Sequence, residues 1–313
     1  MTGLVASTTD LHRELSASLQ GRVLQSEPMA GHTTFGLGGP ADLFVLAESI
    51  SDLQTTLLFA DQNRLTVVAL GDGSNVLVSD RGVRGIVVKL VGSFDEMQIV
   101  GDVLIAGAGA GFSRAIAHLS SAGFAGLEIL YGVPGSIGGG ICMNAGTRYG
   151  WLSDLLIDAE LINRNGIAAT ATAKDLGMSY RHSILQDTET PPFVTSARFQ
   201  LKQEAVESVK LRIAAIAKAR QDSQPLNWRS CGCMFKNPEG DSAGRLIDSC
   251  GLRGLSIGNV AVSDKHANFF VTRESCKAAD VKALALKVQE SVRQQAGVEL
   301  ELEVKLLGEW ADD

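Results

Sequence analysis

The sequence predicts an α+β protein with two domains. Its 313 residues correspond to about two domains of roughly 150 residues each. Up to about residue 200, short β-rich runs alternate with glycine loops and only two or three helices, and a helical pattern rich in Lys, Arg and Ala follows. Mixed short elements of this kind are typical of α+β layers rather than of a repeating βαβ sheet. We place the domains at residues 20–202 and 203–313.

The composition argues against several classes of partner. Hydrophobic residues make up 45% and charged residues 20%, which is typical of a soluble globular protein. A net charge of -7 and an aromatic content of 5% argue against nucleic acid, because a basic surface and stacking side chains are both missing. No apolar run approaches the ~18 residues of a spanning helix, so we expect no membrane partner. Five scattered cysteines and a start without a secretory signal predict a cytoplasmic protein.

Apolar periodicity and turn residues predict the elements of the first domain. A short amphipathic helix leads into the body of the domain, and Gly123 is expected to end the last of its helices. The expected helices are 9–20, 51–63 and 112–122, and the clearest strands are 66–70, 86–90, 103–106 and 157–162.

Two long helices and a closing strand are expected in the second domain. The first helix lies in an 18-residue stretch after residue 203, and the second covers 277–295. The strand covers 299–307, where apolar and charged residues alternate. The alternating residues are Leu300, Leu302, Val304 and Leu306 on one face and Glu299, Glu301, Glu303 and Lys305 on the other.

Two glycine-rich segments look suited to phosphate. Residues 67–78 read VVALGDGSNVLV, in which a strand runs into glycines that let backbone N–H groups approach an anion. The same residues also suit a simple β-turn. Residues 131–150 contain seven glycines, and Pro134–Gly139 offer N–H donors and a hydroxyl before a helical stretch. This second segment is neither a P-loop nor a Rossmann fingerprint, and packing alone could also explain its glycines. Two such loops imply a ligand with two phosphates.

Together with five further blocks, these segments resemble one family. The blocks occur in family order between residues 31 and 308. They are TTFGLGG at 33–39, SYRHS at 179–183, CGCMFKNP at 231–238, HANF at 266–269 and LELEVK at 300–305. The whole set resembles the UDP-N-acetylenolpyruvoylglucosamine reductase family of bacterial cell-wall synthesis. No long insertion follows Arg181, so the chain is similar to the branch that lacks an extra substrate-covering loop.

The resemblance implies a fold and a bound cofactor. The fold is a split, two-lobe FAD-binding domain of the vanillyl-alcohol-oxidase/PCMH type, followed by a smaller C-terminal α+β domain for the substrate. FAD is bound non-covalently, mostly through main-chain N–H groups. The expected FAD contacts are Gly71, Gly73, Ser74, Asn75, Gly135, Ser136, Ile137 and Gly138.

The resemblance also implies a two-stage reaction. NADPH gives hydride to FAD and leaves, and the enolpyruvyl ether of UDP-N-acetylglucosamine then accepts that hydride on its vinyl carbon. The negative charge that develops beside the substrate carboxylate needs a cation, and the neighbouring carbon needs a proton. The product is UDP-N-acetylmuramate, a peptidoglycan precursor. The partners are therefore a UDP-sugar and NADPH, and the sequence names no protein partner.

Three residues are expected to be catalytic. Arg181 suits the carboxylate because a guanidinium stays charged and donates two aligned N–H groups. Glu303, which the resemblance singles out from its polar face, is expected to polarise the same carboxylate as a protonated acid. Cys233 stands where the family usually has a serine proton donor, and we expect the thiol to donate instead.

Three more residues are expected to contact the substrate: Tyr180, Lys236 and Asn237. Ser223 stands where many relatives carry a basic residue, which puts one diphosphate or NADPH contact in doubt. No metal site is expected, because no second cysteine pair or histidine cluster accompanies Cys231 and Cys233.

Two other functions stay open from the sequence. The first is a sugar or alcohol oxidase on the same FAD-binding scaffold. Such oxidases often tether FAD through His or Cys near the first glycine loop, and Gly71–Asn75 contain neither residue. The second is a silent protein that senses a sugar nucleotide, which only the Cys233 replacement suggests. Turnover with NADPH separates the sensor from the enzyme.

Overall fold

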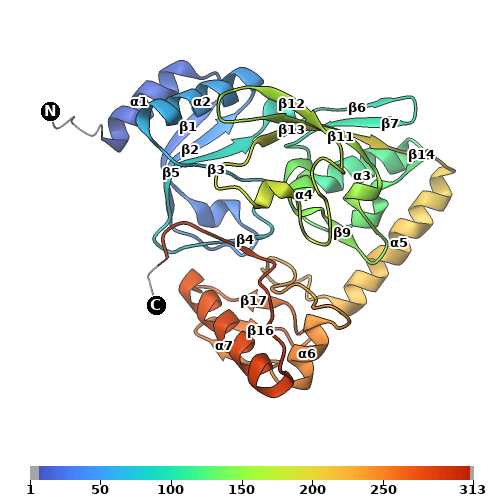
Figure 1. The fold of residues 1–313 in the computed structure, drawn as a ribbon. Coiled ribbons are helices and arrows are strands. Elements are labelled where there is room, and N and C mark those ends of the chain that lie inside the picture. The colour runs from blue at the N-terminus through green and yellow to red at the C-terminus, as the bar shows by residue number, and fades with distance from the viewer. Residues whose placement is uncertain (1–6, 311–313) are drawn as a thin grey trace. The chain divides into compact units, whose positions relative to one another are not determined.

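The computed structural model describes residues 7–310. The described part leaves out residues 1–6 and 311–313. The first range begins the segment used above to judge targeting, and the second ends the second predicted domain. The chain divides into two compact units (Figure 1). Unit 1 consists of Met1–Glu27, Ala41–Asp72 and Arg84–Ala217, and unit 2 of Pro28–Pro40, Gly73–Val83 and Lys218–Asp313, as far as each is described. The domain limits at residues 202 and 203 stay a prediction.

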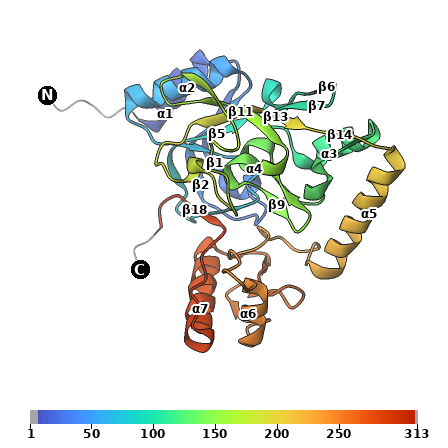
Figure 2. The same ribbon diagram turned by 45° about the vertical axis from the view of Figure 1, so that its right-hand side comes forward.

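Unit 1 contains a first sheet covered by two helices. Its strand order is β1 (Arg22–Pro28), β2 (Pro40–Ala47), β5 (Val83–Leu90) and β3 (Val67–Ala69), and β3 runs parallel to β5. The helices α1 (Thr8–Ser18) and α2 (Ile50–Asn63) lie side by side in both views (Figures 1 and 2). Serine hydroxyls at both N-caps accept amide hydrogen bonds, which satisfies donors that the first helical turn leaves open.

A second sheet of unit 1 has five antiparallel strands. Their order is β12 (Ala168–Ala171), β11 (Leu156–Ile162), β13 (Phe193–Gln200), β7 (Val103–Gly107) and β6 (Met97–Val100). Two helices, α3 (Phe112–Ser121) and α4 (Ile137–Met143), share one apolar core with this sheet. Side chains alternate between the two faces of the sheet, so that one face joins this core. In β7, Leu104 and Ala106 are buried, while Ile105 between them is exposed.

Short elements complete unit 1. Two small antiparallel pairs are β8 (Phe124–Ala125) with β14 (Lys202–Gln203), and β9 (Gly146–Thr147) with β10 (Gly150–Trp151). The long helix α5 (Val206–Ser223) begins in unit 1. The 3-10 turns of unit 1 are Gly92–Asp95, Leu127–Leu130, Leu152–Asp154 and Ile184–Gln186.

Unit 2 packs two helices and short strands around its own core. The strands β15 (Ser256–Ile257), β16 (Val260–Val262) and β17 (Phe270–Thr272) form an antiparallel sheet, and β18 (Lys305–Leu307) pairs in parallel with β4 (Val76–Val78). The helices are α6 (Ala243–Ser249) and α7 (Ala278–Ala296), and a 3-10 turn covers Met29–His32. The apolar stripe of α7 is fully buried: Val281, Leu284, Val288 and Val292.

The predicted helices are confirmed to within a few residues, but the strand predicted at 299–307 is wrong over most of its length. Only Lys305–Leu307 form a strand. Upstream of it, Glu301 O accepts from Lys236 N at 2.8 Å and Glu303 N donates to Met234 O at 2.9 Å. The extended segment therefore changes partner halfway along, from residues 234–236 to β4. The apolar alternation survives only in part, because Leu300 and Val304 are buried whereas Leu302 and Leu306 are only partly buried.

Within residues 7–310, the helices are all too short or too polar to cross a membrane.

Candidate functional site

The two glycine segments meet within unit 1. Gly71 follows β3, and Gly135 and Ser136 lead into α4. A Cβ atom on Gly71 would lie only 2.6 Å from Ser136 Oγ, so a larger residue at position 71 would force the Ser136 hydroxyl to move. A Cβ on Gly111 would lie 3.8 Å from Asp72 Oδ2 and 3.9 Å from Gly135 O. Both loops and residue 111 therefore lie close together.

Some backbone amides at these loops are available and others are not. Among the described residues, the amides of Gly71 and Gly135 donate to no protein acceptor, and the same is true of Ser136. In contrast, Ile137 N donates to Ala110 O at 2.9 Å and Gly138 N donates to Ala108 O at 2.8 Å. The expectation that main-chain N–H groups hold the cofactor therefore suits residues 71, 135 and 136. At residues 137 and 138 the amides already bind protein, and these residues shape the loop.

The unit 1 loops fit the diphosphate of FAD. The amides left without protein acceptors and the Ser136 hydroxyl are neutral donors of the type that phosphate oxygens accept. Asp72 adds a negative charge beside them, and Lys89 Nζ lies 3.6 Å from Asp72 Oδ1, so a cation accompanies it. The donor set thus suits the phosphate groups of such a cofactor.

The remaining loop residues predicted for FAD lie in unit 2. Gly73 has a φ of +61°, and a Cβ there would lie 1.9 Å from His32 O. The Asn75 side chain donates from Nδ2 to Glu303 O at 3.0 Å, and Asn75 O accepts from Lys305 N at 3.0 Å. Asn75 therefore fixes the segment that carries Glu303. Ser74 lies between these two residues in the chain.

Arg181 lies at the tip of a tight hairpin in unit 1. Ser179 and His182 exchange two backbone hydrogen bonds of 3.1 and 3.2 Å, which leaves Tyr180 and Arg181 as the two turn residues. Arg181 has a φ of +53°, in the left-handed region that glycine adopts most easily. A charged residue in this conformation costs stability and needs a reason of its own. Such backbone positions cluster at functional sites.

The guanidinium of Arg181 is held from several sides. Its Nη1 donates to Gly146 O at 2.8 Å, and its Cζ lies 5.5 Å from the ring centroid of Trp151 and 5.8 Å from that of Tyr180. The two rings meet edge to face at 5.5 Å. A Cβ on Gly146 would lie 2.1 Å from the Trp151 ring, so glycine is required for the indole to pack there. The sequence reasoning identified Tyr180 and Arg181 but missed Trp151.

In unit 2, the segment that carries Cys233 is clamped between two others. Cys233 forms a β-bridge with Phe269, and Phe235 forms one with Leu302. Asn268 is buried, and its amide accepts from Phe235 N at 2.9 Å and donates to Phe235 O at 2.8 Å. This side chain replaces a partner strand at that point, so it sets the position of Cys233 and of Lys236.

Cys233 and Glu303 lie close to the same buried thiol. Burial raises the pKa of Cys231 well above its ordinary value, and the charges of Cys233 and Glu303 raise that pKa further. Cys231 therefore stays protonated at neutral pH. Burial lowers the pKa of Arg220, and the charge of Cys233 opposes that shift. The structure thus brings Cys233 and Glu303 together in unit 2 and adds Arg220, which the sequence reasoning missed.

Glu303 differs from its neighbours in burial. Glu299 and Glu301 are exposed, whereas Glu303 is partly buried. Glu301 Oε1 pairs with Lys236 Nζ at 2.6 Å instead. Asn237 Oδ1 accepts from Ala243 N at 3.0 Å, so this side chain also organises the start of α6. The strand pattern alone could not have separated these glutamates.

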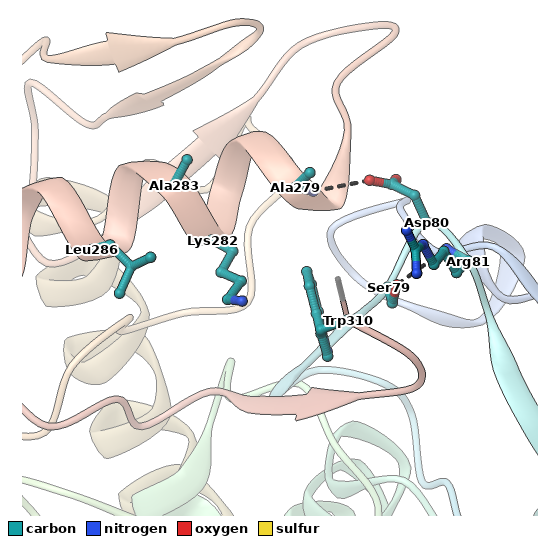
Figure 3. Close-up of a pocket in the computed structure, with 8 residues that line it drawn as sticks. All are labelled: Ser79, Asp80, Arg81, Ala279, Lys282, Ala283, Leu286 and Trp310. Carbon is teal, nitrogen blue, oxygen red and sulfur yellow. Dashed lines mark hydrogen bonds between the residues drawn. The ribbon is translucent and has the colours of Figure 1, made fainter. Parts of the chain in front are cut away.

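A cavity of about 190 Å³ in unit 2 is lined by none of the predicted site residues. Figure 3 shows Lys282 near Trp310, with the Asp80 carboxylate hydrogen-bonded to Ala279 at the start of α7 (Figure 3). Asp80 accepts from the amides of both Ala278 and Ala279 at 2.9 Å. These contacts cap the N-terminus of α7. The residues of this cavity wall therefore have a structural role.

Comparison with known proteins gives consistent matches. Residues 41–172 match the description "FAD binding domain", and residues 224–307 match "UDP-N-acetylenolpyruvoylglucosamine reductase, C-terminal domain". A UDP-N-acetylenolpyruvoylglucosamine reductase from Agathobacter rectalis is 40% identical over 300 residues, covering 92% of this chain and 95% of that protein. One from Moorella thermoacetica is 39% identical over 301 residues, covering 96% and 98%.

A solved structure matches as well. The UDP-N-acetylenolpyruvylglucosamine reductase from Thermus caldophilus superimposes with a TM-score of 0.80 at 35% identity, covering 92% of this chain and 99% of that one. The predicted α+β class and the FAD-binding domain with its C-terminal partner are thereby confirmed. The relationship extends over nearly the whole of both chains at 35–40% identity. The chain therefore belongs to the UDP-N-acetylenolpyruvoylglucosamine reductase family.

Proposed function

We propose that this chain uses NADPH and FAD to reduce UDP-N-acetylenolpyruvoylglucosamine to UDP-N-acetylmuramate for peptidoglycan synthesis. The structural observation that carries the proposal is the left-handed Arg181, whose guanidinium lies beside the rings of Trp151 and Tyr180. A strained cation at a hairpin tip suits a substrate anion. Family membership supplies the identity of that substrate. It also favours the reductase over the oxidase reading.

FAD supplies a hydride carrier between NADPH and the enolpyruvyl group when it is bound. Gly71, Gly135 and Ser136 would hold its diphosphate in unit 1. Gly73, Ser74 and Asn75, which lie in unit 2, are proposed FAD contacts as well. The loop contains no cysteine or histidine between Gly71 and Asn75, which fits non-covalent binding.

Arg181 binds the substrate carboxylate and stabilises the charge that develops beside it. Its Nη1 already donates to Gly146 O, so the guanidinium direction is set before substrate arrives. A preorganised donor of this kind contributes more in the transition state than one that must reorient. Tyr180, the other turn residue, would contact the substrate next to it.

Cys233 gives the proton to the carbon beside the carboxylate. Phe269 and Asn268 fix the backbone of its segment, which sets the position from which the thiol extends. A thiol releases a proton near pH ~8.5, whereas an alcohol does so far less readily. The neighbouring thiol of Cys231 is buried with a raised pKa and is a poor proton donor.

Glu303 polarises the substrate carboxylate as a protonated acid. Glu303 is partly buried, and it lies near enough to the buried Cys231 for its charge to raise the pKa of that thiol. Lys236 and Asn237 would position the nucleotide part of the substrate. The partners are a UDP-sugar and NADPH, without nucleic acid or membrane. We also propose a cytoplasmic location, which suits five cysteines that are all free thiols.

Turnover tests this function. The purified protein should oxidise NADPH only when UDP-N-acetylenolpyruvoylglucosamine is present, and mass spectrometry should find UDP-N-acetylmuramate in equal amount. Binding of the sugar nucleotide without NADPH oxidation would support the sensor and contradict the reductase.

A further inference from the structure

Helix α4 connects the cofactor loop to the Arg181 hairpin within unit 1. Ser136 caps the start of the helix, and Asn144 caps its end. Seven residues at about 1.5 Å each make a spacer of roughly 10 Å. Whatever holds the hairpin to the end of α4 therefore sets where Arg181 lies relative to the cofactor loop.

Asn144 makes that connection with both ends of its side-chain amide. Nδ2 donates to Ser179 O at 2.9 Å, at the base of the Arg181 hairpin. Oδ1 accepts from Ser153 N at 3.1 Å, two residues after Trp151. Asn144 is 2% exposed, so water does not compete for these bonds.

The backbone of Asn144 is also specialised. Its φ of +42° lies in the left-handed region, and its N–H donates to Ile141 O at 3.2 Å to end the helix. Glycine is the residue most often found at such helix ends, and asparagine is the usual substitute. Glycine could end the helix as well, because the cap needs only the left-handed backbone. The side chain of Asn144 therefore has a separate role.

We propose that Asn144 is a positioning residue for Arg181. One buried amide ties down both the hairpin that presents the guanidinium and the segment whose indole faces it. The inference rests on the proposed function, because it assigns the geometry of Arg181 to the substrate step. Ser183 Oγ and Gln186 Nε2 donate to Cys142 O, and Gln186 Nε2 also lies 3.3 Å from Arg181 O at the hairpin tip. The side-chain bond to Ser179, at the base of the hairpin, comes from Asn144.

Asn144→Gly is the decisive variant, because glycine keeps the left-handed cap and removes only the side-chain amide. Asn144→Asp keeps one acceptor for Ser153 N, but a carboxylate would face Ser179 O without a proton to donate. Lowering the pH protonates a buried carboxyl and restores a donor. The matched control is Asn163→Gly, which removes an Oδ1 that accepts from Asn165 N and Ile167 N in a different turn.

The two half-reactions and substrate binding are measured by rapid mixing and titration. Asn144→Gly should keep its FAD content and reduction by NADPH within about twofold. Oxidation of its reduced flavin by UDP-N-acetylenolpyruvoylglucosamine should slow about 10- to 100-fold, because small misplacements of a catalytic group cost up to about 10²-fold. Asn163→Gly should match the wild type in both. The Kd of the oxidised protein for UDP-N-acetylmuramate, a readout independent of turnover, should rise in Asn144→Gly.

Three results decide the proposal. In a double-mutant cycle, Asn144→Gly should add almost nothing to Arg181→Ala, because both remove the same interaction. Asn144→Asp should regain speed as the pH falls toward 5.5, relative to Asn144→Gly at the same pH. Additive losses, or equal losses in both half-reactions, would overturn the positioning role. A wild type that never oxidises its flavin with substrate would instead overturn the proposed function.

Discussion

Two substitutions of Arg181 can separate the backbone strain at this residue from the catalytic role of its guanidinium. Arg181→Ala and Arg181→Gly both remove the guanidinium, but only glycine relieves a φ of +53°. The two variants should therefore lose the same activity and differ in stability.

The expected stabilities follow from the contacts. Both variants lose the bond to Gly146 O, worth about 1 kcal/mol. They also lose two cation–π contacts of about 0.5–1 kcal/mol each. Arg181→Ala should thus lose about 2–3 kcal/mol. Relief of about 1–2 kcal/mol of backbone strain in Arg181→Gly is offset by about 0.4–1 kcal/mol for the freer unfolded chain. The glycine variant should be the more stable by about 0.5–1 kcal/mol.

The assay combines urea unfolding with anaerobic rapid mixing. Both variants should be reduced by NADPH at the wild-type rate, and oxidation of their flavin by substrate should slow at least about 10²- to 10³-fold, as expected when a charged donor is lost. Equal stabilities would refute the backbone argument. Normal oxidation by substrate in either variant would refute the role of Arg181.

Three other predictions use different parts of the molecule. Cys233→Ser should retain product formation. In Cys233→Ala, NADPH should still reduce the flavin, but product formation should fall to background. Normal turnover of the alanine variant would remove the thiol from the mechanism. Gly71→Ala should weaken FAD binding about 10-fold or more in a fluorescence titration, because its Cβ would lie 2.6 Å from Ser136 Oγ. Gly31→Ala, whose Cβ would meet nothing within 4 Å, should bind FAD normally, and equal affinities would contradict the close-approach argument. Burial, followed by the charges of Asp280 and Asp80, raises the pKa of Cys276 from its ordinary value of 9.0 to about 11. The folded state then holds a proton that the unfolded state loses, so the free energy of unfolding should fall as the pH rises from 9 through 11. Cys276→Ala should lessen that fall. An unchanged dependence of the unfolding free energy on pH in this variant would contradict the prediction.

Local pattern predicted the candidate site, and tertiary contacts add residues to it. The glycine loops and the Tyr180–Arg181 turn were visible as motifs because the residues of each motif are adjacent in the chain. Asn144 and Trp151 were not, since their partners Ser179 and Arg181 are about 30 residues away in the chain. An asparagine at the end of a short helix was the one available signal for a left-handed cap.

The closing strand shows the same limit. Alternation correctly placed the buried Leu300 and Val304 on the apolar face, but Leu302 and Leu306 are only partly buried, as Glu303 and Lys305 are. It also carries no information about the partner strand. The segment binds residues 234–236 first and β4 afterwards. Likewise, the amides of Ile137 and Gly138 looked available in the sequence, and only the position of residues 108 and 110 showed that they are used.

One anaerobic experiment tests the central claim most directly. The flavin of the purified protein is reduced with NADPH, and UDP-N-acetylenolpyruvoylglucosamine is then added without oxygen. We predict rapid return of the oxidised flavin spectrum with one equivalent of UDP-N-acetylmuramate, which would show that a chain with Cys233 in place of serine completes the reaction. A flavin that stays reduced, with no product, would contradict the reductase function.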